Sequence, residues 1–359
     1  MSSRKEYRIP CPIVDAKEEK SLVVLTERYN KMLEPGLTAK VGAKLAEALP
    51  EQLRVIGEGA KALITEQELY AQAMKVIGEG FNTVQGLVSK HTISKKTVIA
   101  RVNRISVENQ ITDIEEICLM REYDLAKLVV VEKDLNLLGA IAEGGTTGWF
   151  GFAGIPFNLV LSTFMYYRAV QMVALFYGYD CRGNSSELMI ASNVFTNAMS
   201  PNETSYDEIS SIIGKIMLYA EGEGIKQAAK KTWVEMASRG GIGLLLTQMR
   251  ALARKSAEKA LVKVGQKGLE QSVFKKVFEQ IGKKLTLKVV QRSVPVIGSA
   301  IGALFDAGQM HKVVEYADVF YRKRFILEKA ARIDELIGIA DDSIIDIPME
   351  DLVSDFFAT

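Results

Sequence analysis

A run of twenty uncharged residues in the middle of the chain limits the possible folds more than any other feature. Residues 148–167 read GWFGFAGIPFNLVLSTFMYY, and between Asp134 and Arg168 the only charged residue is Glu143. A helix of about twenty apolar residues is long enough to cross a bilayer. The run is therefore either a membrane span, an interfacial hairpin or a buried core element.

Small residues and a proline inside the run favour the buried element. Glycine recurs every three residues and a proline follows, at Gly148, Gly151, Gly154 and Pro156. Because proline suits the first turn of a helix, we interpret this stretch as a turn leading into a buried helix from Phe157 to Tyr177. Gly178 is placed to cap that helix, and Asp180 to start the next segment. A hairpin that inserts into a membrane stays open, whereas a permanent span is the poorest of the three interpretations.

Helical periodicity dominates the rest of the chain. From Ser21 the apolar residues fall at helical spacing until Pro35-Gly36, and a second such pattern runs from Leu49-Pro50 to about residue 88. Strand-like alternation occurs only near residues 97–105. The sequence thus predicts an all-α fold, a multi-helix bundle around a central Gly/Pro-rich apolar helical hairpin, with few or no strands.

A second small-residue stretch lies near the C terminus. Residues 293–308 read SVPVIGSAIGALFDAG, in which Pro295 precedes Gly298 and Gly302. Such small-xxx-small spacing allows helix backbones to approach closely, in bilayers and in protein cores alike. We divide the chain into an irregular arm (1–20), an N-terminal helical region (21–104), a helical domain (105–330) and an acidic tail (331–359).

Charge is distributed unevenly although the net charge is only +1. Residues 226–292 hold sixteen Lys or Arg and four Glu, and nine Asp or Glu lie from Glu328 to the end against two basic residues. Four lysines recur every four residues at Lys255, Lys259, Lys263 and Lys267, with apolar residues between them. This pattern predicts a basic amphipathic helix or helix pair that contacts an anionic membrane surface. Alternatively, the lysines are a solvated face that the acidic tail folds back to balance.

The sequence provides little evidence for catalysis. The two histidines, His91 and His311, are isolated, and no phosphate-binding loop, nucleophile elbow or ligand-spaced pair of metal ligands is present. We therefore expect no metal and no cofactor, and favour a protein that is not an enzyme. The basic stretch lacks interleaved surface aromatics, which argues against a nucleic-acid partner. Three scattered cysteines and a charged N terminus predict a cytoplasmic protein.

Five segments together resemble the EcsC family of bacterial proteins, in order and in spacing. They are REYDLAK (121–127), GGTTGWFGFAGIPFNL (144–159), ALFYGYD (174–180), VPVIGSAIGALFD (294–306) and YADVFYRKRFILEKA (316–330). The residues that carry the match are Gly148, Gly151, Gly154, Pro156, Tyr177, Gly178, Tyr179, Asp180, Pro295, Gly298 and Gly302. The resemblance covers residues 105–330 and implies an α-helical domain. The family's founding member is encoded beside an ABC exporter and linked to the membrane, and no catalytic residues are established for the family.

Three functional hypotheses follow. The first is a cytoplasmic protein that associates peripherally with anionic lipid, as an accessory to an ABC exporter or to secretion. Its predicted membrane contacts are Trp149, Phe150, Phe152, Ile155, Phe157, Lys255, Lys259, Lys263 and Lys267. The second is a soluble module, of the chaperone or toxin-partner type, that binds a protein partner through the N-terminal helices. The third is a lipid- or acyl-binding protein with a cavity between the two glycine-marked helices, and a large apolar pocket near Asp180, Asp306 and His311 would support it.

Overall fold

The structure, a computed structural model, is helical and without strands in the residues that it describes, which are 6–33, 65–89, 92–130, 154–201, 207–218, 241–292 and 307–338. The complete elements are α1 (Ala16–Leu33), α4 (Glu66–Glu79), α5 (Phe81–Ser89), α6 (Lys95–Asn103), the 3-10 helix η1 (Glu115–Leu119), α8 (Ile155–Phe176), α9 (Ser185–Met199), α10 (Glu208–Leu218), α13 (Gly241–Arg292) and α15 (Ala307–Ile337). Residues 122–130 form a further helical segment. The predicted all-α fold is confirmed.

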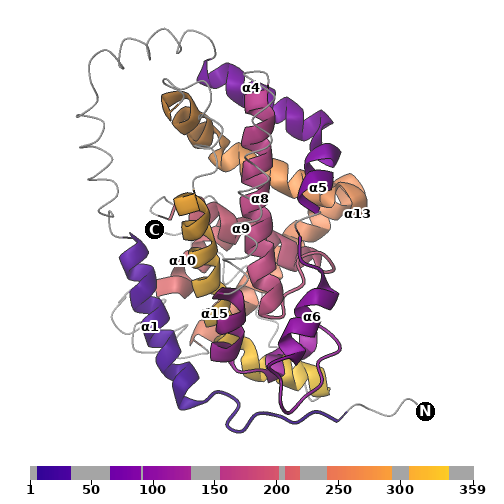
Figure 1. Cartoon of the computed structure of the whole chain (residues 1–359), viewed down its shortest axis with the longest axis vertical. Helices are drawn as coiled ribbons and strands as arrows, with labels where there is room; N and C mark the ends of the chain where they lie inside the picture. The colour runs from indigo at the N-terminus through magenta and orange to yellow at the C-terminus, as the bar shows by residue number, and fades with distance from the viewer. Residues whose placement is uncertain are drawn as a thin grey trace.

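Helix α8 is the centre of the bundle. It packs against α4, α5, α9 and α15, and Figure 1 shows it running through the middle of the molecule. Among the described helices it is the one long and apolar enough to cross a membrane, but 83% of its most apolar window is buried inside the protein. A helix that is apolar on all sides needs such burial. Its position is that of a core helix.

The start of α8 agrees with the prediction made from glycine and proline. Gly154 is the N-cap residue and Pro156 lies in the first turn. Pro156 has no N–H to leave unpaired there, so proline is tolerated at this place. The glycines at 148 and 151, which would form the turn of the predicted hairpin, lie outside the described residues.

Local capping residues explain where the other helices begin. Thr65 and Glu68 form a capping box at the start of α4, in which the Glu68 N–H donates to Thr65 Oγ1 at 3.2 Å and the Thr65 N–H donates to Glu68 Oε2 at 2.9 Å. At the start of α6, Ser94 Oγ accepts from the Thr97 N–H at 3.1 Å. The strand considered for residues 97–105 is therefore wrong, since most of this stretch is helix α6.

An aromatic cluster joins α5, α8 and α13. The Phe164 ring lies 5.1 Å from the Phe81 ring and 5.0 Å from the Phe274 ring, both edge-on, and Phe278 continues the cluster along α13. Edge-to-face pairs add about 0.5–1.5 kcal/mol beyond the apolar area that they bury. The second half of α13 is thereby fixed against the central helix, with its phenylalanines in the core.

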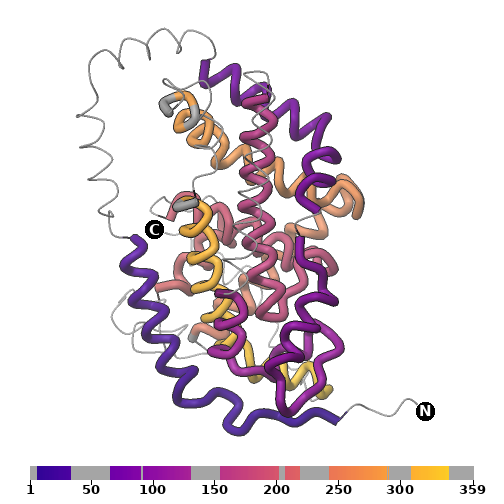
Figure 2. The backbone as a smooth tube through the Cα atoms, viewed as in Figure 1, coloured from indigo at the N-terminus to yellow at the C-terminus, as the bar shows by residue number. Residues whose placement is uncertain are grey.

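Helix α1 begins earlier than the sequence suggested. Asp15 Oδ1 accepts hydrogen bonds from the N–H groups of Lys17 and Glu18, at 2.9 and 2.8 Å, and Glu18 Oε2 accepts from the Asp15 N–H at 3.1 Å. This capping box starts the helix at Ala16, so the predicted irregular arm over residues 1–20 is too long. Helix α1 then packs along α15 and α10, and Figure 2 traces it down one side of the molecule.

Candidate functional site

The chain reverses direction at the end of α8 through residues 177–180. The N–H of Tyr179 donates to the Ala174 carbonyl at 3.0 Å, and the N–H of Gly178 donates to the Leu175 carbonyl at 3.0 Å. These two bonds form a Schellman motif, which requires a positive φ at its central residue. Gly178 has φ +82°, so the predicted glycine cap of this helix is confirmed.

A second requirement also restricts position 178 to glycine. The Arg332 guanidinium donates to the carbonyls of Tyr177 and Gly178, at 3.0 and 2.9 Å, from the last part of α15. A Cβ atom at position 178 would lie 2.4 Å from Arg332 Nη2 and 2.9 Å from the Ile114 carbonyl oxygen. Glycine is therefore needed both for the backbone conformation and for the close approach of Arg332.

The two tyrosines on either side of Gly178 are hydrogen-bond donors to α15. Tyr177 OH donates to Asp318 Oδ1 at 2.7 Å, and Tyr179 OH donates to Glu328 Oε2 at 3.0 Å. Burial raises the pKa of both phenols above its ordinary value, and the adjacent carboxylates raise it further. Both hydroxyls thus keep their protons and tie the end of α8 to α15.

Arg324 is the centre of the buried charges. Its side chain is fully buried and donates to both oxygens of Glu187, at 2.6 and 2.7 Å, while its Nε donates to Glu328 Oε2 at 3.1 Å. The guanidinium also lies 4.0 Å from the centre of the Tyr179 ring. Arg250, from α13, reaches the same Glu328 oxygen at 2.9 Å. Burial alone would raise the pKa of Glu328, but the surrounding arginines hold this pKa below its ordinary value.

A second group of buried charges attaches α1 to the same helix. Glu18 is fully buried and accepts from Lys329 Nζ at 2.6 Å, from Arg121 Nη1 at 3.0 Å and from the Glu122 N–H at 3.0 Å. The Glu122 side chain in turn pairs with Arg322. We call these two groups together the buried ion network, formed by Glu18, Arg121, Glu122, Tyr177, Tyr179, Glu187, Arg250, Asp318, Arg322, Arg324, Glu328, Lys329 and Arg332.

The network brings together three of the segments that carry the family resemblance. Residues 121–127 supply Arg121 and Glu122, residues 174–180 supply the two tyrosines, and residues 316–330 supply the partners on α15. These segments are far apart in the sequence. Buried ion pairs contribute little net stability, but removal of one partner leaves an uncompensated charge and costs about 3–5 kcal/mol. The network therefore fixes how the helices are placed relative to one another.

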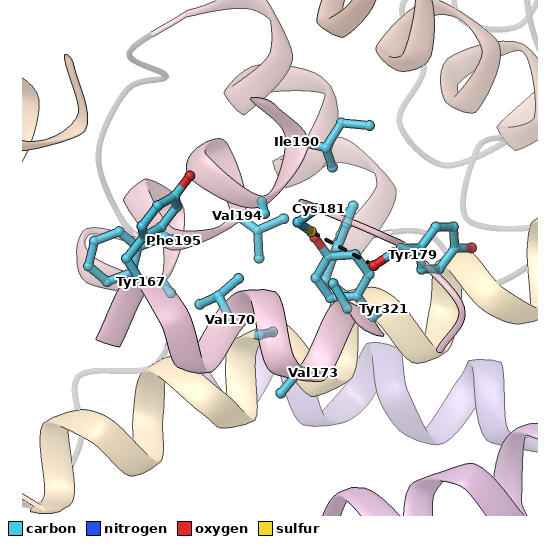
Figure 3. Close-up of a cluster of buried hydrophobic side chains, with 14 of the residues drawn as sticks. Tyr167, Val170, Val173, Tyr179, Cys181, Ile190, Val194, Phe195 and Tyr321 are labelled. Atoms are coloured by element: carbon cyan, nitrogen blue, oxygen red, sulfur yellow. Dashed lines mark hydrogen bonds between the residues drawn. The ribbon is translucent and has the colours of Figure 1, made fainter. Parts of the chain in front are cut away.

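The thiols near the network are not activated. Cys181 lies beside Tyr179 and Tyr321 at one end of the buried cluster in Figure 3, which extends to Tyr167 and Phe195 at the other end. Burial raises the pKa of the Cys181 thiol well above its ordinary value, and burial raises the pKa of Cys118 as well. A thiol that stays protonated is a poor nucleophile. Within the described ranges, no group of three or more His, Cys, Asp or Glu side chains is placed to hold a metal ion.

Asp180 and His311, two of the three residues proposed to lie near an acyl-binding cavity, are not brought together. Asp180 pairs with Lys95 on α6, and its Oδ1 accepts from the Arg182 N–H at 3.1 Å. His311 lies 3.7 Å from Glu315 near the start of α15, about 30 Å along that helix from the end that contacts Gly178. Asp306 lies outside the described residues. Asp180 also does not start the next helix as predicted, because Asn184 caps α9 by accepting from the Ser186 and Glu187 N–H groups.

Two of the predicted membrane contacts lie at the start of α8 in the structure, and both are at least partly buried. Ile155 is only 9% exposed, and Phe157 is half-buried against the core. Ile155 is therefore not available to a membrane in this arrangement. The other predicted positions of this region and of the second small-residue stretch, Gly148, Trp149, Phe150, Gly151, Phe152, Pro295, Gly298 and Gly302, lie outside the described residues.

The four predicted lysines, in contrast, are all on the surface. Lys255, Lys259, Lys263 and Lys267 are exposed, and none forms an ion pair with another residue that the structure describes. They do not follow one continuous stripe, because α13 bends between Lys263 and Lys267. The prediction of a single helix through all four is wrong, and the alternative of a helix pair is correct.

The bend in α13 requires glycine. Gly265 has φ 67° and ψ 175°, a conformation that only glycine adopts readily, and it separates two helical halves. Beside it Val262 is 90% exposed and Val264 is 37% exposed. Figure 2 shows α13 turning at the edge of the molecule. We call residues 255–267 the basic elbow.

Sequence reasoning missed most of the buried ion network. One signal was present, because Arg322, Lys323 and Arg324 are consecutive on a helix and three consecutive residues point in directions about 100° apart. On a helix packed on several sides, at least one of them must be buried. Lys323 and Arg324 both have no exposed surface. Two acidic members of the network, Glu187, which pairs with Arg324, and Glu18, which pairs with Lys329, carried no comparable signal. Each lies in the first turn of a helix, where acidic residues are common.

Together, the central apolar helix, the charged helix α15 and the buried ion network that joins them define the protein as an all-α bundle whose helices are positioned by internal ion pairs. The sequence model of the EcsC protein family matches residues 16–326, which is most of the chain. The protein therefore belongs to the EcsC family. The match begins well before residue 105, so the N-terminal helices belong to the family region and are not an addition to it. No curated protein matches the chain, and no solved structure matches it.

Proposed function

We propose that this EcsC-family protein associates peripherally with anionic membrane surfaces through the basic elbow of α13 and does so without catalysis. The observation that carries the proposal is Val262, which is 90% exposed on a helical half that also presents Lys255, Lys259 and Lys263 to solvent. An apolar side chain surrounded by lysines matches the boundary between lipid headgroups and acyl chains.

The expected strength of this contact is modest. Each lysine near an anionic leaflet contributes on the order of 1 kcal/mol, and insertion of Val262 adds roughly 1–2 kcal/mol. The sum corresponds to attachment that is reversible and sensitive to salt, because the electrostatic part is screened within about 10 Å at ordinary ionic strength. A cytoplasmic protein of this kind, accessory to an ABC exporter or to secretion, would bind and leave the membrane without spanning it.

The burial of helix α8 favours peripheral attachment over insertion of this helix into the membrane. The helix is packed on all sides by α4, α5, α9 and α15, so its exposure to lipid would require the bundle to open. The basic elbow already lies on the surface and needs no such change. We therefore assign the membrane contact to the elbow, with Lys255, Lys259, Lys263, Lys267 and Val262 as the contacting residues.

Co-sedimentation with vesicles tests the proposal. The native chain is mixed with vesicles of increasing anionic lipid content at low and at high salt, beside a variant with the four elbow lysines changed to glutamine. A matched control changes four exposed lysines elsewhere, Lys20, Lys31, Lys96 and Lys312, to glutamine and so alters the net charge equally. We expect binding that rises with anionic content, is kept by the control and is lost by the elbow variant. Equal loss in both variants, or no binding of the native chain at low salt, would exclude the elbow as the contact.

A protein partner at α1 is the second candidate function. Val23 and Val24 are 50% and 60% exposed on the outer side of this helix, although Leu22 and Leu25 beside them are buried. Two adjacent exposed valines on an N-terminal helix fit the hypothesis of an interaction module. A pull-down with the native chain that recovers one partner, and fails with Val23→Asp and Val24→Asp, would favour this function over lipid binding.

A further inference from the structure

We propose that the acidic C-terminal segment, residues 339–359, binds the basic elbow and competes there with the anionic membrane. This inference rests on the proposed function, because the competition has meaning only if lipid binds the elbow. The C-terminal segment would be a second, internal occupant of the basic elbow. Membrane attachment would then be controlled by the protein's own C-terminal segment.

Charge complementarity is the first argument. The elbow presents four exposed lysines, and the one acidic residue among them, Glu258, lies 3.5 Å from Arg254. The segment 339–359 contains six carboxylates and no Lys or Arg. Its acidic residues are Asp341, Asp342, Asp346, Glu350, Asp351 and Asp355. The surface and the segment therefore have opposite charges in similar number.

Apolar complementarity is the second argument. Val262 is 90% exposed, and an exposed valine is stabilised by any apolar partner that covers it. The same C-terminal segment places apolar residues between its acids, at Ile344, Ile345, Ile347, Leu352, Val353, Phe356 and Phe357. A purely acidic tail would satisfy only the lysines, whereas this one offers both kinds of contact.

The length of the segment is sufficient. Helix α15 ends at Ile337, and its Arg332 contacts the end of α8 at Gly178. Ten residues earlier on α8, Arg168 Nη2 pairs with Glu270 Oε2 at 2.8 Å, and Glu270 lies five residues after the elbow's glycine. The path from Ile337 to Gly265 is about 30 Å along these helices, since each helical residue advances 1.5 Å, and the two steps between packed helices add about 8–10 Å each. An extended chain of this length reaches about 70 Å, more than the path requires.

The contact would be reversible. Exposed ion pairs contribute about 0–1 kcal/mol each, so the segment gains its occupancy from being tethered, at an effective concentration in the millimolar range. A membrane presents many anionic headgroups at once and can displace it. Loss of the segment's negative charge would then strengthen membrane binding, and added negative charge on the segment would weaken it.

Lysine labelling without lipid tests the internal contact by itself. The full chain and a variant with the six acids changed to Asn or Gln are treated with an amine-reactive reagent, and the rate at each lysine is measured by mass spectrometry. We expect slower reaction in the native chain at the four elbow lysines, Lys255, Lys259, Lys263 and Lys267. If the segment leaves the elbow free for about one-tenth of the time, their labelling rates fall by roughly tenfold. Exposed lysines elsewhere, Lys75 and Lys312, are controls whose rates stay equal. Equal rates at the four elbow lysines would overturn the inference.

Vesicle binding of the same two chains tests the competition. We expect the neutralised variant to bind anionic vesicles more tightly than the native chain, by a factor similar to the protection seen in labelling. If native and variant chains bind equally, the inference fails although the proposed function stands. If the lysines are protected but neither chain binds vesicles, the proposed function fails, and with it the competition, while an internal contact remains.

Discussion

Substitution of Gly178 by alanine is the sharpest test of the site at the end of α8. The backbone there has φ +82°, which costs an L-residue about 1–2 kcal/mol. The new Cβ would also lie 2.4 Å from Arg332 Nη2, so the guanidinium must withdraw from the carbonyls of Tyr177 and Gly178. Loss of two hydrogen bonds from a buried charged donor adds roughly 2–3 kcal/mol. We expect the free energy of unfolding to fall by about 3–5 kcal/mol.

The assay is urea unfolding, with the free energy extrapolated to zero denaturant. Gly214→Ala, in α10, is the matched control because nothing lies within 4 Å of its added Cβ and its backbone is helical. This control should gain up to about 1 kcal/mol from its better helix propensity. Combining Gly178→Ala with Arg332→Met should destabilise by less than the sum of the two, since one clash partner is already gone. A loss below about 1 kcal/mol for Gly178→Ala would refute the reasoning, because the strain of the positive φ alone should reach that value.

Two further predictions concern the charged side chains buried on α15. Arg324→Met leaves Glu187 and Glu328 without their common partner, so the free energy of unfolding should fall by about 3–5 kcal/mol in urea titrations, and a change under about 1 kcal/mol would contradict the network. Burial lowers the pKa of Lys323 to about 7, and its Nζ donates to two uncharged oxygens among the described residues, Thr26 Oγ1 at 2.7 Å and the Met217 carbonyl at 2.9 Å. Because the folded pKa lies below the ordinary 10.5, its contribution to stability is fully present above about pH 10.5 and is lost as the pH falls to about 7. Melting temperatures of native and Lys323→Met chains between pH 6 and 9 should therefore show a rise with pH that is weaker in the variant, and parallel curves would exclude this effect of Lys323.

The sequence predicted those features that depend on local chemistry. Pro156 and Gly178 marked the two ends of α8 because their backbone preferences act within one turn. The lysines at 255–267 were placed correctly on the surface since long charged side chains are rarely buried without partners. The sequence did not locate the bend at Gly265, because glycine inside a helical pattern is compatible with a straight helix. In the structure Phe274 packs against Phe164 of α8 and Phe278 against Tyr70 of α4, and these distant contacts fix the direction of the second half.

The buried ion network could not be predicted because it depends on contacts between distant parts of the chain. Glu18 and Lys329 are separated by 311 residues, and neither residue type is expected in a core. Only the fold shows that α1 and α15 lie side by side, and that three motifs which the sequence presents as separate act at one place. The membrane contact expected for Ile155 followed from its apolar neighbours, but the same neighbours are what a core helix needs.

The environment of residue 262 in the presence of lipid shows directly whether the basic elbow contacts the membrane. Val262→Cys, in a chain whose exposed Cys11 is replaced by serine, is labelled with an environment-sensitive fluorophore, and Val107→Cys, at a valine that is 96% exposed, is the labelled control. We expect emission from position 262 to rise and to shift to shorter wavelength with anionic vesicles, salt to reverse this change, and position 107 not to respond. Unchanged emission at position 262 with anionic vesicles, or an equal response at both positions, would contradict this expectation.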